Sequence, residues 1–93
     1  MKNVRLRRCF VYVLGSVISS KQEKIRTYVG WSNDLEKRVS QHNKGEGAKS
    51  TRGWQWRLLY VEIFLTRSEA MSREWHLKRD RKFRRILVQN WMI

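Results

Sequence analysis

The stretch FVYVL, residues 10–14, decides the fold, because it is dense in aromatic and β-branched side chains and is typical of a β-strand. A period of two places its even-numbered residues, Tyr12 among them, on one face and its odd-numbered residues on the other. A second strand with the same alternation is expected over residues 25–31, after a polar loop over residues 19–24. The two strands lie close enough along the chain to pair as an antiparallel hairpin.

Helix signals follow the second strand. Asn33 can cap a first helix, and Glu36 three residues later completes a capping-box pattern. Gly45 ends this helix, and the glycine-rich, basic segment 44–53 is expected to be a mobile loop.

The rest of the chain predicts one more strand and two more helices. The strand is expected over residues 56–64, and Thr66 or Ser68 caps a helix that runs to about residue 78. Asp80 then caps a third helix with apolar residues at helical spacing. The order β-β-α-β-α-α predicts a small α/β sandwich.

Composition bounds the class of protein. The 93 residues make one domain, residues 1–93, and 41% hydrophobic content is enough for a core. The single cysteine, Cys9, excludes a disulfide framework within the chain and fits a reducing cytoplasm. A net charge of +13 favours nucleic acid as the partner, with an anionic membrane or an acidic protein as alternatives.

The N-terminus has the outline of a signal peptide, with basic residues before an apolar run over residues 9–18. The run is short and is not followed by a small-residue cleavage motif. It also falls below the roughly 18 apolar residues of a membrane span. We therefore interpret it as a buried strand and expect no membrane association.

One acidic residue interrupts the apolar pattern of the second helix. Glu74 shares a face with Ala70 and Leu77, at spacings of four and three residues. A carboxylate on an apolar stripe costs free energy unless a metal or another cation satisfies it. The alternative is a structural ion pair with an arginine, for instance Arg38.

Polar and aromatic residues elsewhere are also candidates. Arg38 and His42, at i and i+4, point the same way and suit a phosphate and a proton transfer. Alternatively, Arg38 pairs with Asp34 and His42 only borders the apolar stripe. Tyr12 and Tyr28 are mid-strand aromatics whose usual role is packing.

The tryptophans have two readings. Trp54, Trp56, Trp75 and Trp91 could stack on exposed bases. At this density tryptophans more often fill a small core, and we expect this of Trp75. For Trp54, which follows the basic loop, base stacking and core packing are both alternatives.

Several fragments, in order, carry a family resemblance. They are FVY (10–12), YVG (28–30), SNDLEKRVSQHN (32–43), GEGAKSTRG (45–53), LYVE (59–62) and SEA with RE and LK (68–70, 73–74, 77–78). Together they resemble the GIY-YIG nucleases, in particular small stand-alone bacterial members and the N-terminal nuclease domain of the excinuclease of DNA repair. The resemblance covers about residues 9–88.

The resemblance implies a three-stranded, mostly antiparallel sheet flanked by three helices, with the site on the concave face. It implies that Tyr12 and Tyr28 lie near the attacking water, and that Arg38 holds the scissile phosphate. His42 matches a histidine found in some members, and Glu74 matches the ligand of one divalent ion, Mg²⁺ or Mn²⁺. The sequence departs from the family at Phe10, at Trp31 and in the 15 residues between the tripeptides.

We therefore predict a metal-dependent endonuclease that hydrolyses DNA phosphodiesters, as in DNA repair, with a protein partner for targeting. The candidate phosphate contacts are Lys37, Lys44, Lys49, Arg52 and Lys78. The alternatives are a non-catalytic nucleic-acid-binding module on the same fold and a small basic component of a ribonucleoprotein.

Overall fold

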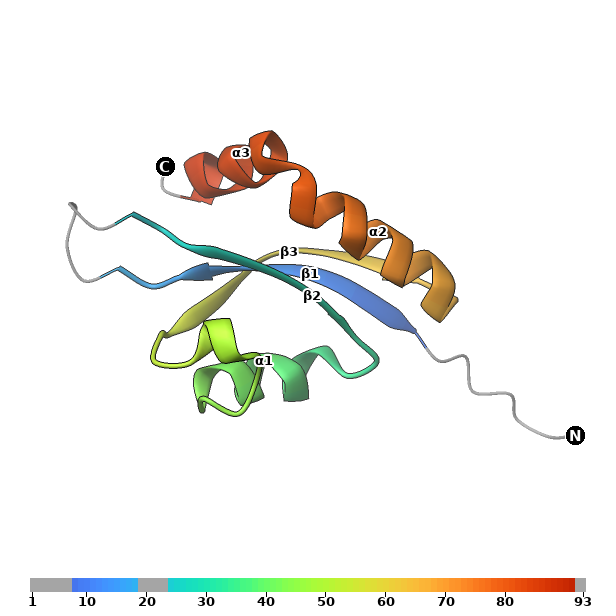
Figure 1. Cartoon of the computed structure of the whole chain (residues 1–93), viewed down its shortest axis with the longest axis horizontal. Helices are drawn as coiled ribbons and strands as arrows, with labels where there is room; N and C mark the ends of the chain where they lie inside the picture. The colour runs from blue at the N-terminus through green and yellow to red at the C-terminus, as the bar shows by residue number, and fades with distance from the viewer. Residues whose placement is uncertain (1–7, 19–23, 92–93) are drawn as a thin grey trace, which may run out of the picture.

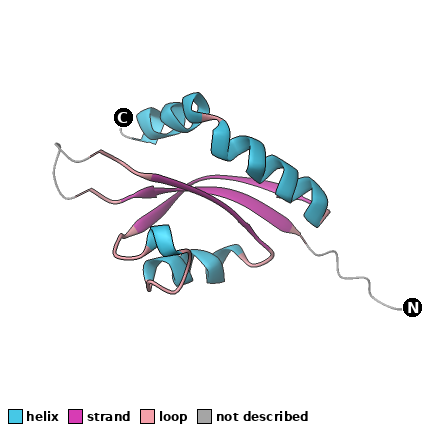
Figure 2. Cartoon of the chain, viewed as in Figure 1, coloured by secondary structure: helices cyan, strands magenta, loops and turns pink. Residues whose placement is uncertain are grey.

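The computed structural model describes residues 8–18 and 24–91 of the chain. These residues form one sheet and three α-helices, with a short 3₁₀ turn between α1 and β3 (Figure 1; Figure 2). The elements are β1 (Cys9–Ser16), β2 (Thr27–Ser32), α1 (Leu35–Asn43), η1 (Lys49–Thr51), β3 (Trp56–Phe64), α2 (Arg67–Arg79) and α3 (Arg81–Trp91). The predicted order β-β-α-β-α-α is confirmed.

The sheet has the strand order β2-β1-β3, and both pairings are antiparallel. The antiparallel pairing expected between the first two strands is confirmed, and residues 19–23 of the connection lie outside the described residues. Tyr12 lies opposite Gly30 on β2 and opposite Val61 on β3. β1, which carries Tyr12, is therefore the central strand, and β2 is an edge strand.

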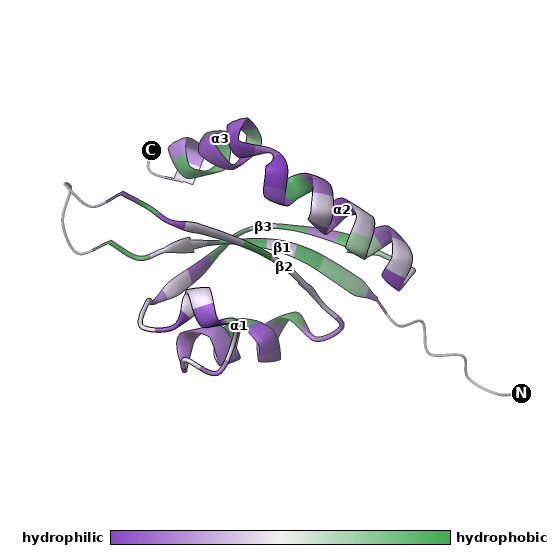
Figure 3. Cartoon of the chain, viewed as in Figure 1, coloured by the Kyte–Doolittle hydropathy of each residue, from purple (hydrophilic) through white to green (hydrophobic). Residues whose placement is uncertain are grey.

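Helices cover both faces of the sheet, α1 on one side and α2 with α3 on the other (Figure 1). The odd-numbered side chains of β1 pack in a cluster with Ala70 and Leu77, both 0% exposed. On the other face, Tyr12 and Leu14 pack in a second cluster that includes Leu35 and Val39 of α1. Burial on both faces explains why β1 is an almost continuous apolar run, visible as the hydrophobic centre of Figure 3.

The cap of α1 is one residue later than predicted. Asp34 caps the helix, and its Oδ1 accepts the backbone N–H of Lys37 at 3.2 Å. Asn33 instead directs its side-chain amide to the Cys9 sulfur at 3.6 Å. The capping box with Glu36 is therefore wrong, because Glu36 lies two residues after the true cap. A carboxylate is as good an N-cap as an amide, so sequence preference did not separate the two.

The other caps agree with the prediction. Of the two candidates for α2, Thr66 is the cap, since its hydroxyl accepts the N–H of Glu69 at 3.2 Å. Asp80 accepts the N–H of Phe83 at 3.0 Å at the start of α3. The strand bounds shift by one or two residues, as hydrogen-bonded pairing extends β1 beyond its aromatic centre.

Two expectations are wrong. The segment over residues 44–53 is not simply loop, because it contains the turn η1 and the fully buried Thr51. Trp75 is 53% exposed instead of filling the core. The Arg79 guanidinium lies 3.6 Å from the centre of its ring, on the outer side of α2. No helix in the described part of the chain is long and apolar enough to cross a membrane.

Candidate active site

Three of the predicted site residues meet on the α1 side of the sheet. Tyr12 comes from β1, Tyr28 from β2 and His42 from α1. The Tyr12 hydroxyl lies 2.9 Å from Nε2 of His42, and the Tyr28 and His42 rings are centred 4.8 Å apart. The two tyrosine rings are centred 6.4 Å apart. The structure therefore brings together residues that are 30 positions apart in the sequence.

Two glycines make room for this cluster. A Cβ atom at Gly30 would lie 2.5 Å from the Tyr12 hydroxyl, and one at Gly47 would collide with Nδ1 of His42. Neither glycine has a positive φ, so close approach and not backbone freedom requires them. Gly30 belongs to the quoted tripeptide, whereas Gly47 was not singled out from the sequence.

A chain of hydrogen bonds fixes the direction of the protons that link Tyr12, His42 and Thr51. Thr51 donates its hydroxyl to the Ala48 carbonyl at 2.7 Å, so its oxygen accepts from Nδ1 of His42 at 2.9 Å. A neutral imidazole with its proton on Nδ1 presents an acceptor at Nε2. Tyr12 is therefore the donor in the Tyr12–His42 bond. The tautomer of His42 is thus assigned from its hydrogen-bond partners.

Thr51 is held in place by a small network of hydrogen bonds that links α1 to β3. Asn43 accepts the Trp56 N–H at 2.6 Å and donates to the Trp56 carbonyl at 3.2 Å. The Trp56 indole donates to the Thr51 carbonyl at 2.9 Å. Sequence reasoning missed all three roles. The only sequence signal was the place of Asn43 and Thr51 within the fragments that carry the family resemblance, and Trp56 lies outside those fragments.

Burial sets the ionisation of the cluster. It raises the pKa of Tyr12 to about 12, with the nearby Tyr28 adding to the rise and the Arg38 guanidinium opposing it. Burial also lowers the pKa of His42 to about 4, and the positive charge of Arg38 lowers it further. Both residues are therefore neutral at neutral pH, in agreement with the direction of the hydrogen bond between them.

Arg38 lies beside this cluster at the edge of an open groove. The groove is formed by the end of β2 and the first two turns of α1, and Trp31, Lys37 and Gln41 also line it. Arg38 donates to the Gln41 side chain at 3.1 Å, so the alternative pairing with Asp34 does not form. The groove thus presents a guanidinium and an ammonium, and the guanidinium is close enough to Tyr12 to act on its pKa.

Glu74 is not gathered with the other four. It lies on α2, in the opposite helical layer, and forms an ion pair with Lys78 at 3.1 Å. The alternative partner Arg38 is therefore excluded, although a structural ion pair does exist. Its charge reaches the cluster only as the smallest contribution to the raised pKa of Tyr12. Within the described residues, no three Asp, Glu, His or Cys side chains form a metal-binding group.

The predicted phosphate contacts are all on the surface. Lys37 lies on α1, and the α1–β3 connection carries three more exposed cations, at positions 44, 49 and 52. This connection lies on the α1 side of the sheet (Figure 1). Lys78 is also exposed but belongs to α2 and is engaged with Glu74.

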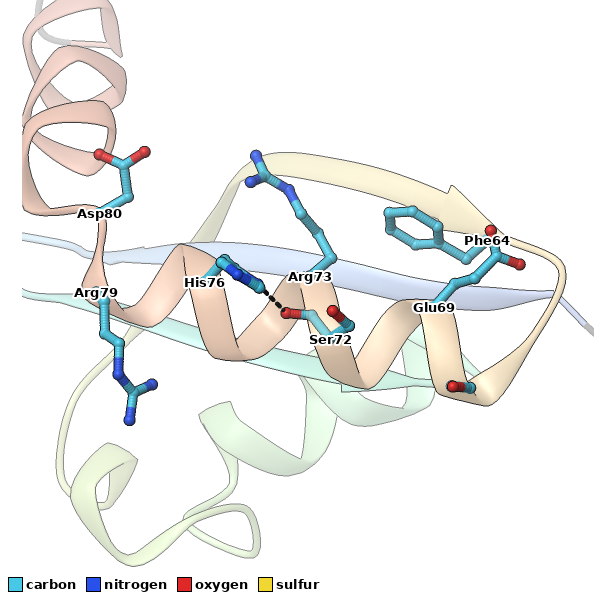
Figure 4. Close-up of a pocket in the computed structure, with 8 residues that line it drawn as sticks. Phe64, Glu69, Ser72, Arg73, His76, Arg79 and Asp80 are labelled. Atoms are coloured by element: carbon cyan, nitrogen blue, oxygen red, sulfur yellow. Dashed lines mark hydrogen bonds between the residues drawn. The ribbon is translucent and has the colours of Figure 1, made fainter.

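A larger surface depression follows α2 and does not coincide with the predicted site (Figure 4). Two of its polar side chains, Arg73 and His76, are already engaged within the protein. Arg73 donates from Nε to both oxygens of Glu62, at 3.1 and 2.9 Å. His76 Nδ1 lies 2.8 Å from the Ser72 carbonyl of its own helix. The Arg73 guanidinium and the His76 imidazole of this depression are therefore held by contacts within the fold.

The chain matches the GIY-YIG catalytic domain over residues 8–86. It belongs to the GIY-YIG family of nucleases. Among its relatives, a UPF0213 protein of Clostridium perfringens is 45% identical over 71 residues, which are 75% of this chain and 70% of the relative. The UPF0213 protein YazA of Bacillus subtilis is 41% identical over 67% of this chain and 65% of the relative.

A third relative, a UPF0213 protein of Haloquadratum walsbyi, is 52% identical over 55% of this chain and 58% of its own length. These names state no activity. No solved structure is significantly similar to the chain. The family is thus shown, and the chemistry has to be argued from the site.

Proposed function

We propose that this protein is a metal-dependent endonuclease that hydrolyses DNA phosphodiester bonds at the Tyr12–His42 cluster. The proposal rests on one observation above all, the ordered hydrogen-bond chain from Tyr12 through His42 to Thr51. A binding module has no need of a buried, oriented proton acceptor. Hydrolysis does, because the attacking water has to lose a proton.

In this proposal, Tyr12 relays the proton of the attacking water. Its oxygen accepts a proton from water as its own proton passes to Nε2 of His42, and His42 keeps its bond from Nδ1 to Thr51. The relay avoids a free phenolate. Tyr28, whose ring packs on His42, makes no hydrogen bond through its hydroxyl to another described residue and is available to orient the water.

The relay is inactive in the resting protein. The pKa values of about 12 for Tyr12 and about 4 for His42 oppose transfer of the proton between them. The low pKa of His42 makes it a weak final acceptor for the proton of water. Substrate has to raise the proton affinity of His42.

Arg38 supplies the coupling to substrate. Its positive charge is one of the two causes of the low pKa of His42. A phosphate bound to the guanidinium would offset that charge, so the pKa of His42 would rise when substrate is present. Arg38 would then also stabilise the negative charge that develops on the phosphoryl oxygens.

Glu74 is the proposed ligand of one Mg²⁺ or Mn²⁺ ion. A lone carboxylate fits a hard cation that takes its other oxygen ligands from water and phosphate. Its ion pair with Lys78 is partly exposed, with side-chain exposures of 20% and 49%, so a divalent ion could displace the ammonium. When bound, the ion would supply Lewis-acid stabilisation of the phosphodiester oxygens.

A cleavage assay with matched tyrosine variants tests the proposal. The purified chain is incubated with plasmid and branched DNA in Mg²⁺, Mn²⁺ or a chelator. Tyr12→Phe should abolish cleavage, whereas Tyr60→Phe, which removes the hydroxyl that donates to Glu62 on β3, should not. Cleavage that survives Tyr12→Phe refutes the relay. DNA binding with no cleavage under any metal identifies a non-catalytic module instead.

Thr51→Val separates the relay from simple packing. The change keeps the shape of the side chain and removes the acceptor for Nδ1 of His42. We expect slower cleavage with unchanged DNA affinity.

The free, buried Cys9 fits a reducing compartment, and we propose the cytoplasm as the place of action.

A further inference from the structure

A basic groove lies on the face of β2 opposite the Tyr12 cluster. It is formed by residues at the start of β2 and by α3. Four cations line it, namely Lys24, Arg81, Arg84 and Arg85, together with Thr27. No carboxylate among the described residues lines this groove, so its charge is not balanced from within.

Arg84 is the least satisfied of these cations. It donates to the Thr27 hydroxyl at 3.2 Å and to the Lys78 carbonyl at 2.9 Å, and both acceptors are neutral. Its Nε is buried without any hydrogen-bond partner, the only such buried side-chain atom among the described residues. A partly desolvated guanidinium without a counter-ion is costly, and an anion in the groove would stabilise it.

Packing explains only part of this arrangement. The two bonds of Arg84 tie the α2–α3 junction to β2, which is a structural role. Arg81 and Arg85 are exposed and belong to neither of the ion pairs found in the described residues. Their convergence with Lys24 and Arg84 adds repulsion that the fold itself does not require.

We propose that this groove binds a phosphodiester of a nucleic-acid backbone, as a second contact separate from the catalytic cluster. Guanidinium groups match phosphate oxygens with paired, charge-assisted hydrogen bonds. Thr27 and Tyr28 are neighbours on the edge strand β2, and their side chains point to opposite faces. A backbone that passes around this edge can contact both sites. The inference extends the proposed function and fixes the path of the flanking nucleic acid.

Salt-dependent binding tests the groove without any requirement for cleavage. A labelled duplex is titrated in a chelator at several salt concentrations. We expect the double variant Arg81→Gln/Arg85→Gln to lower the slope of log K against log salt by up to about 1.8, from about 0.9 per phosphate contact. The control Arg57→Gln/Lys82→Gln removes the same charge from exposed positions outside the groove and should change the slope far less. Equal loss in both variants overturns the proposal.

The buried Nε–H of Arg84 gives a second, local readout. Its ¹⁵N–¹H resonance should shift on titration with the duplex, while that of exposed Arg57 should stay. An Arg84 signal that stays while the duplex binds, or that responds only to phosphatidylglycerol vesicles, overturns the proposal. Neither experiment uses a metal ion or measures cleavage. Each can therefore support or overturn the phosphate-binding groove even if the proposed nuclease activity fails.

Discussion

Acidification should destabilise the fold through His42. The folded pKa of His42 is lowered from 6.5 to about 4, chiefly by burial. Between these two values only the unfolded chain carries the proton, so protonation favours unfolding. The stabilisation is complete above the unfolded pKa and is lost as the pH falls towards about 4. At 1.36 kcal/mol per pKa unit, the loss approaches about 3 kcal/mol.

Urea denaturation at several pH values between about 7 and 4 measures this loss. His42→Gln is the reference, because it removes the titration while its amide can still bond Tyr12 and Thr51. The carboxylates titrate in both proteins, so the difference in unfolding free energy between them reports His42. Between about pH 7 and pH 4 we expect the wild-type protein to lose about 3 kcal/mol of unfolding free energy relative to His42→Gln.

The control is His76→Gln, which removes an exposed imidazole from α2. It should follow the wild-type pH dependence. A wild-type curve parallel to that of His42→Gln over the whole range would refute the argument, because it would mean that folding does not shift the protonation of His42.

Three further outcomes are expected. Gly30→Ala should lower stability by about 1–3 kcal/mol in thermal melts, since its Cβ would lie 2.5 Å from the buried Tyr12 hydroxyl; an unchanged melt contradicts this. Arg38→Ala should retain its circular dichroism spectrum but lose cleavage, and normal cutting would remove its phosphate role. Glu74→Gln should abolish metal-dependent cleavage while DNA binding persists, and melts in a chelator should move by at most about 1 kcal/mol, since the pair with Lys78 is partly exposed. A larger loss with cleavage intact would make Glu74 structural.

The sequence predicted the elements well where burial imposes a period. The strand around Tyr12 alternates between two cores, and the period of two places Tyr12 and Leu14 on one face and Val11 and Val13 on the other, as the structure has them. The cap at Asp80 and one of the two candidate caps of α2, Thr66, also agree with the structure, because their hydrogen bonds are local. The cap of α1 was misplaced by one residue, since Asn33 and Asp34 are equally suitable caps and only the contact of Asn33 with Cys9 separates them.

The partners within the site could not be predicted, because they depend on long-range geometry. Thr51 looks like any loop hydroxyl until the bonds of Asn43 and Trp56 place it under His42. The exposure of Trp75 could not be predicted either. Charged residues occupy most of the surface of α2, so helical periodicity does not show which side of the helix meets the sheet.

The resting contacts of the two charged site residues are of a kind that substrate can replace. Arg38 donates to the neutral side chain of Gln41, and Glu74 pairs with Lys78 at a partly exposed position. Such contacts are worth about 1 kcal/mol or less at an exposed ion pair and about 1.5–3 kcal/mol for a hydrogen bond to a charge. The buried cluster differs, since its protons are fixed by bonds that solvent does not reach. Under the proposed function, Arg38 would therefore exchange Gln41 for phosphate and Glu74 would exchange Lys78 for the metal ion, while the buried relay kept its geometry.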